Sequence, residues 1–179
     1  MDYEETYAPV VKVETLGILF VISALKGHLM DVVTAFLHSN LKDIIYVKQP
    51  EGSTDPQHPN HVCLLNKALY SLKQLALEWY DTLPMVLEFS ELQFKRIESD
   101  HAVFVACTKL SMVYLALFID DIAIFGDDEQ FIRNIKLKLS SHFKMKDLGI
   151  IRRFLGLDIS HNSNGDVLLS QQHYLECVL

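Results

Sequence analysis

The spacing of apolar residues along the chain predicts three helices. Residues 13–26 are apolar on most sides, which indicates a largely buried helix. Residues 76–90 form a second helical segment, although Pro84 removes one helix hydrogen bond. Residues 128–143 form an amphipathic helix, because apolar residues recur at every fourth position. The apolar face of the second segment consists of Trp79, Leu83, Val86 and Leu87. That of the third consists of Phe131, Ile135, Leu139 and Phe143.

Runs of aliphatic and aromatic residues predict strands around these helices. The runs cover 44–48, 102–106, 112–119, 122–125, 150–159 and 166–170. Asp120 and Asp121 separate two of the runs, which indicates a β-hairpin with an acidic turn. Residues 50–60 contain three prolines and a glycine and are expected to form a loop. The order of the elements indicates an α+β fold with an antiparallel sheet.

Composition and charge restrict the function of the chain. It has 179 residues, 50% of them hydrophobic, so one domain is the expected organisation. Its 23 acidic and 16 basic residues give a net charge of −7, which argues against unassisted nucleic-acid binding, since phosphates are neutralised by Lys and Arg. Residues 133–153, however, contain seven basic residues and one acid, a net charge of +6. This segment is either a solvated helix face or a contact surface for nucleic acid.

Cysteine usage and hydropathy indicate the compartment. Cys63, Cys107 and Cys177 are too few and too far apart for a disulfide framework or a zinc site, which favours a reducing compartment. Apolar runs near the N-terminus are too short to cross a bilayer, and acids rather than bases begin the chain. We therefore expect a soluble intracellular protein without membrane contact, in the cytoplasm or the nucleus. His58 and His61 are expected to be solvated loop residues, because no fourth zinc ligand is near.

Three aspartates beside apolar segments, Asp31, Asp120 and Asp121, are the candidate chemical site. Carboxylates in such surroundings are costly, and two held ~4 Å apart repel by about 4 kcal/mol at an effective dielectric constant of ~20. A divalent cation removes this cost, and oxygen ligands favour Mg²⁺ or Mn²⁺. Neighbouring strand residues face opposite sides, so one aspartate of the pair is the main ligand, and Asp120 ranks first. The alternative is that the pair forms only a polar turn.

Eight short segments resemble, in the same order, those of copia-type retrotransposon reverse transcriptases. The stretch Met30–Leu37 is similar to the first catalytic motif of that family, and Phe118–Asp121 is similar to its Tyr-Val-Asp-Asp box. Residues 69–74 followed by Trp79 and Tyr80 resemble its Leu-Tyr-Gly-Leu-Lys-Gln…Trp-Tyr segment. The five other matches begin at residues 5, 49, 146, 154 and 169. Together the matches run from near residue 5 to the end of the chain.

The resemblance implies a right-hand polymerase palm with residual fingers over residues 1–179, and no RNase H or integrase domain in this chain. It implies that Asp31, Asp120 and Asp121 hold two Mg²⁺ (or Mn²⁺) ions for nucleotidyl transfer. The partners it implies are dNTPs and an RNA or DNA template-primer. The rest of a Pol polyprotein is then expected to lie outside this chain.

The resemblance also implies three substrate-binding residues. Phe36 matches the position beneath the incoming sugar, where a bulky ring would exclude a 2′-hydroxyl. Gln74, with its neighbour Lys73, matches a position near the template and the nucleotide. From the residues alone, core packing explains Phe36 equally well, and an exposed helical position explains Gln74.

Departures from the family pattern leave the activity of the chain open. Ser71 replaces a glycine, Leu77 replaces an arginine, Gly17 replaces a frequent arginine, and Phe118 replaces a tyrosine. The lost arginine removes a phosphate or carboxylate clamp. An inactive remnant of the same domain is therefore an alternative function. A receiver-like Mg²⁺-binding signalling domain is a weaker alternative, because there the acidic pair follows the first strand, whereas here it comes late.

Overall fold

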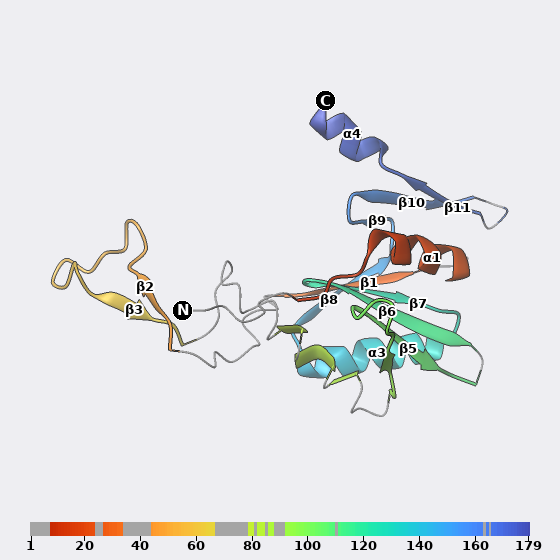
Figure 1. Cartoon of the computed structure of the whole chain (residues 1–179), viewed down its shortest axis with the longest axis horizontal. Helices are drawn as coiled ribbons and strands as arrows, with labels where there is room; N and C mark the ends of the chain where they lie inside the picture. The colour runs from red at the N-terminus through yellow and green to blue at the C-terminus, as the bar shows by residue number, and fades with distance from the viewer. Residues whose placement is uncertain are drawn as a thin grey trace.

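The centre of the fold is a six-stranded antiparallel sheet, seen in a computed structural model (Figure 1). The structure describes residues 8–23, 27–33, 44–66, 79–80, 82–84, 86–87, 92–109, 111–162, 164 and 166–179. The strand order is β4-β5-β6-β7-β1-β8, and each neighbouring pair is antiparallel, as predicted. The strands are β1 (His28–Val32), β4 (Lys95–Arg96), β5 (Val103–Cys107), β6 (Met112–Phe118), β7 (Asp121–Phe125) and β8 (Met145–Ile150).

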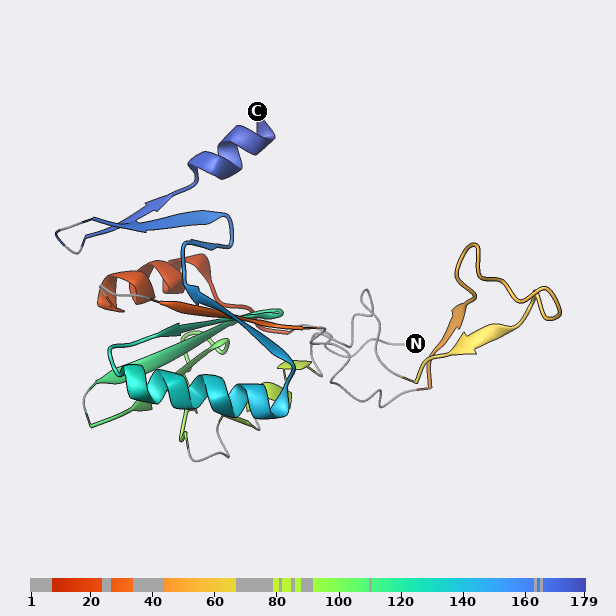
Figure 2. The same cartoon turned by 180° about the vertical axis from the view of Figure 1, so that it is seen from behind.

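Two smaller antiparallel sheets accompany the central one. Strands β2 (Tyr46–Lys48) and β3 (Val62–Leu64) form a hairpin around the predicted loop. Strands β9 (Arg153–Phe154), β10 (Leu157–His161) and β11 (Val167–Ser170) form a three-stranded sheet beside α1 (Figure 2). The chain then enters the short helix α4 (Gln172–Val178). Among the described residues, no helix is both long and apolar enough to cross a membrane.

Helices cover both faces of the central sheet. Helix α1 (Val13–Ser23) lies on one side of it and α3 (Glu129–His142) on the other (Figures 1 and 2). The ring of Phe20 in α1 meets the edge of Phe125 in β7, with centroids 5.1 Å apart. Helix α3 begins after Asp128, whose side chain accepts the Phe131 N–H at 2.9 Å. The amphipathic pattern predicted over 128–143 is confirmed, because Ile132, Ile135 and Leu139 are buried.

The prediction that the first helix is largely buried is wrong. One side of α1 packs into the core through Leu16, Leu19 and Phe20. The other side leaves apolar residues in solvent, among them Val21, which is 76% exposed. The described elements next to α1 cover only part of its surface, so a helix that is apolar on all sides leaves some of its apolar residues exposed.

The C-terminal third also differs from the predicted strands. The single strand predicted over 150–159 is instead the end of β8, then β9 and the start of β10. Leu155 and Gly156 have φ angles of 51° and 76°, and this left-handed backbone turns the chain between β9 and β10. The apolar pattern did not predict β1, β3, β4, α4 or the part of β8 before residue 150. The helix predicted over 76–90 is confirmed where its residues are described.

A β-bulge joins β8 to β1. Leu29 pairs with Gly149 and Met30 with Asp147, so Leu148 is an extra residue on β8. Gly149 has a φ of 75°, which glycine adopts without steric cost. The side chain of Asp147 accepts the Gly149 N–H at 2.9 Å and holds the bulge closed. These contacts give a physical reason for the Lys-Asp-Leu-Gly sequence at this position.

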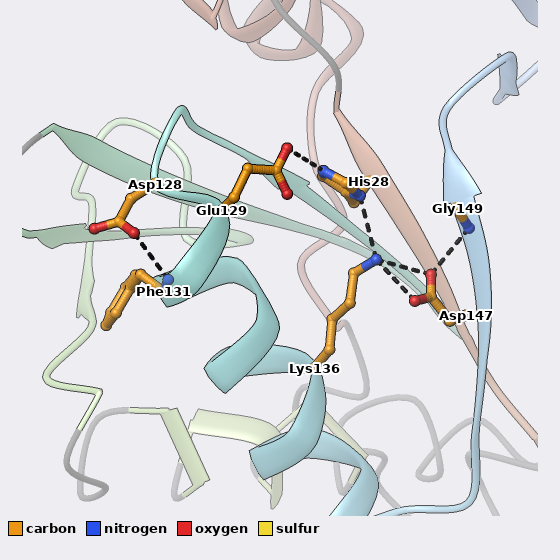
Figure 3. Close-up of polar contacts among 7 residues, drawn as sticks. All are labelled: His28, Asp128, Glu129, Phe131, Lys136, Asp147 and Gly149. Carbon is orange, nitrogen blue, oxygen red and sulfur yellow. Dashed lines mark hydrogen bonds and ion pairs between the residues drawn. The ribbon is translucent and has the colours of Figure 1, made fainter.

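A polar network connects this bulge to helix α3 (Figure 3). The Lys136 Nζ atom donates to both carboxylate oxygens of Asp147, at 2.9 and 2.8 Å, and lies 3.2 Å from His28 Nδ1. Burial raises the pKa of Asp147, but hydrogen bonds from Lys136 and Gly149 outweigh it and hold that pKa below its ordinary value. The network therefore holds α3, β1 and β8 together.

We expect Lys136→Met to lower the free energy of unfolding by about 1 kcal/mol at pH 7, measured by urea unfolding. It removes a charged hydrogen bond whose partner is half-exposed and therefore partly screened by solvent. Because the pKa of Asp147 is lowered in the folded state, its stabilisation is present above the ordinary aspartate pKa and is lost as the pH falls through the lowered value. Wild type and variant should therefore converge at low pH.

The matched control is Arg133→Met on the exposed face of the same helix. It should change the free energy of unfolding by less than about 0.5 kcal/mol. An equal loss in both variants would contradict a specific role for the network.

Candidate functional site

The register between β1 and β7 brings two of the predicted carboxylates together. Asp31 lies directly opposite Asp121 in the antiparallel pair. Opposed residues of such a pair project from the same face of a sheet, with Cβ atoms about 4.5–5.5 Å apart. Both side chains are half-buried. Two residues that are 90 positions apart in the sequence therefore share one patch of the central sheet.

Asp120 lies at the turn that precedes β7. The sequence placed the turn at Asp120 and Asp121, whereas the structure places it at Ile119 and Asp120 and makes Asp121 the first residue of β7. Ile119 has a φ of 53°, a strained conformation for a β-branched residue. The Asp120 carbonyl oxygen accepts the Val32 N–H at 2.9 Å. The turn is thus bonded to the residue that follows Asp31.

The three neighbouring carboxylates affect the pKa of Asp121. Burial, followed by the charges of Asp31 and Asp120, raises the pKa of Asp121 to about 6. Asp31 and Asp120 are therefore both close enough to Asp121 for their charges to act on it. Such an all-oxygen set with unfavourable mutual charge suits a hard divalent cation such as Mg²⁺.

The three carboxylates do not form a complete metal-coordination site. Across the part of the chain that the structure describes, no three His, Cys, Asp or Glu side chains converge to hold one ion. The structure thus supplies an opposed carboxylate pair and an adjacent third carboxylate, which fits the donor chemistry of a cation site but not a complete coordination shell.

Other residues singled out from the sequence fall into two groups. Phe36, Lys73 and Gln74 lie outside the described residues, as do Ser71 and Leu77. His58 and His61 are exposed in the loop between β2 and β3, where their rings stack with centroids 4.4 Å apart. The sequence did not single out Ile119 or Val32, because their roles in the turn depend on backbone groups that every residue carries.

Most of the basic side chains in the segment 133–153 are exposed. Lys136 is an exception, because it bonds to Asp147 and lies beside His28. The exposed basic residues of the segment are Arg133, Lys144, Lys146, Arg152 and Arg153. Two of them, Arg152 and Arg153, line a surface pocket with Leu29 and Ile150. The segment therefore leaves a basic surface at the β8 edge of the central sheet.

Comparisons with known proteins identify the family of the chain. The family model described as reverse transcriptase (RNA-dependent DNA polymerase) matches residues 1–179. A putative transposon Ty5-1 protein of Saccharomyces cerevisiae is 37% identical over 146 residues, which cover 82% of this chain and 47% of that protein. The retrovirus-related Pol polyprotein from transposon TNT 1-94 of Nicotiana tabacum is 36% identical over 183 residues, covering 100% of this chain and 14% of the polyprotein.

A further relative is the retrovirus-related Pol polyprotein from transposon RE1 of Arabidopsis thaliana. It is 36% identical over 178 residues, covering 98% of this chain and 12% of the polyprotein. The chain thus spans less than half the length of these relatives. The fold and site define a mixed α/β domain with an antiparallel sheet and acidic residues on neighbouring strands. The chain belongs to the reverse transcriptase family of retrotransposon Pol polyproteins, as its motifs indicated.

We expect Asp121→Asn to raise the free energy of unfolding at pH 8. With its pKa raised to about 6, folded Asp121 binds a proton more tightly than the unfolded chain does, so its contribution to stability falls as the pH rises from about 4 to about 6. Asparagine cannot ionise and removes this penalty. Urea unfolding at pH 4 and pH 8 should show a gain at pH 8 that shrinks at pH 4.

The exposed Asp127, just beyond β7, supplies the control. Asp127→Asn should leave the difference between the two pH values unchanged. A gain of equal size for Asp127→Asn would show that net charge, rather than crowding at the site, governs the effect.

Proposed function

We propose that the chain is the catalytic part of an RNA-directed DNA polymerase, a palm with residual fingers. In this proposal it extends a DNA primer with dNTPs on an RNA or DNA template, as part of a longer Pol polyprotein. The observation that carries the proposal is the register that sets Asp31 opposite Asp121, with Asp120 at the adjoining turn. Membership of the reverse transcriptase family supports the same function.

In the proposed mechanism, Asp31 and Asp120 are the main ligands of two Mg²⁺ or Mn²⁺ ions, and Asp121 is the third carboxylate. These residues would hold the ions, which would supply Lewis-acid stabilisation for the primer 3′-hydroxyl and for the leaving pyrophosphate. Because the pKa of Asp121 is about 6, protonation of this carboxylate would compete with a cation below that pH, so cation binding would weaken as the pH falls through about 6. The Asp120 backbone contact with Val32 keeps the turn beside Asp31.

Three substrate contacts complete the proposal. We assign Phe36 to the face of the incoming sugar, and Lys73 and Gln74 to the nucleotide and template. Their support comes from the matching sequence motifs. The exposed basic residues near β8, among them Lys144 and Lys146, are proposed to contact the phosphates of the template-primer.

The test combines metal binding with primer extension. Binding of Mn²⁺ is measured by electron paramagnetic resonance, and DNA synthesis on an RNA template is measured with Mg²⁺. We expect Asp120→Asn to weaken Mn²⁺ binding and to reduce synthesis by roughly 10³-fold or more, because a preorganised charge contact with the reacting groups is lost. Asp31→Asn should have a comparable effect.

The control is Asp127→Asn, which alters an exposed carboxylate beyond the proposed site. It should retain both Mn²⁺ binding and synthesis. Synthesis that survives Asp120→Asn would refute the mechanism. Mn²⁺ binding that depends on Asp120, without any synthesis above the Asp31→Asn background, would identify the chain as an inactive remnant that keeps its cation site.

A further inference from the structure

The turn that carries Asp120 adopts a conformation that needs support from its surroundings. Ile119 has a φ of 53°, and a β-branched residue in the left-handed region is held there only when other contacts enforce it. Ile119 is 46% exposed, so it is only partly packed against the rest of the fold. Hydrogen bonds to the backbone of the turn supply contacts of this kind.

One such bond comes from a side chain far away in the sequence. The indole Nε1–H of Trp79 donates to the Ile119 carbonyl oxygen at 2.7 Å, across 40 residues. Trp79 is only 3% exposed whereas Ile119 lies on the partly exposed turn, so loss of the bond would leave the buried indole donor unsatisfied. The bond connects the helical residues 79–80 with the turn between β6 and β7.

The Trp79 indole also packs against helix α3. Its ring meets Phe143 edge-on, with centroids 5.0 Å apart. Phe143 ends helix α3, and its N–H bonds to the Leu139 carbonyl oxygen at 2.9 Å. Helix α3 thus limits the movement of the indole, and the indole limits the movement of the turn.

The other end of the turn is tied to β1. The Asp120 carbonyl oxygen accepts the Val32 N–H at 2.9 Å, one residue beyond Asp31. Trp79 therefore holds the carbonyl group of Ile119, and Val32 in β1 holds that of Asp120. Rotation of the backbone at Asp120 would break these bonds and move Asp120 relative to Asp31.

We infer that Trp79 is a positioning residue for the carboxylate site. Its indole N–H fixes the left-handed turn, and through that turn it sets the position of Asp120 relative to Asp31. This inference rests on the proposed function in so far as the positioned carboxylates bind a divalent cation. Trp79 itself touches neither the cation nor a substrate.

The chain contains a single tryptophan, which permits a test at the level of one atom. Expression of the full chain in a tryptophan auxotroph supplied with β-(3-benzothienyl)alanine replaces the indole N–H by sulfur and keeps the fused-ring shape. The first measurement is amide hydrogen exchange of Val32, with Ile135 in α3 as an internal reference. The second is Mn²⁺ affinity by electron paramagnetic resonance.

We expect protection of the Val32 amide to fall by tenfold or more in the substituted chain, with Ile135 unchanged. Mn²⁺ affinity should fall by roughly tenfold, as expected for one lost hydrogen bond. A purely structural role would lower Val32 and Ile135 protection together. The control Phe143→Leu weakens the ring packing but keeps the indole N–H, and should disturb Val32 less than the sulfur analogue does.

Unchanged protection of Val32 in the analogue would overturn the inference. So would unchanged Mn²⁺ affinity in the analogue while wild type binds Mn²⁺ through Asp120. If wild type and Asp120→Asn bind Mn²⁺ equally, the proposed function fails instead, and the Val32 measurement still decides whether Trp79 holds the turn.

Discussion

The antiparallel pairing of β1 with β7 is the constraint on which the rest of the site depends. A slip of one residue would move Asp31 to the opposite face of the sheet and separate it from Asp121. Burial of Met30 and Val32 on β1 and of Ile122 on β7 opposes such a slip. The apolar core therefore fixes the position of the acidic site, although it contributes no group to the proposed chemistry.

The same arrangement places unfavourable features side by side. Ile119 is held in a left-handed conformation, and burial with two neighbouring carboxylates raises the pKa of Asp121 to about 6. Each feature costs stability, and strain and like charge commonly occur together at functional sites. The structure offsets them with core packing and with hydrogen bonds from Trp79 and Val32 to the turn.

Charge has two different uses in this acidic chain. Part of the basic segment 133–153 is structural, because Lys136 bonds to Asp147 and joins α3 to β8 (Figure 3). Its exposed members, such as Lys144 and Arg152, remain on the surface. A net charge of −7 therefore coexists with a local basic surface, and total charge alone is a poor guide to whether the chain contacts nucleic acid.

The sequence by itself determined the family, the amphipathic helix α3 and the strands β5, β6 and β7 of the antiparallel sheet, because ordered motifs and apolar periodicity are local properties. It could not predict that α1 keeps one apolar side in solvent, or that the strand expected over 150–159 divides at Leu155 and Gly156. The opposition of Asp31 and Asp121, and the bond from Trp79 to Ile119, were decided only by the tertiary structure. Strand register and long-range hydrogen bonds join residues 40 to 90 positions apart, and no local pattern encodes which partner each residue meets.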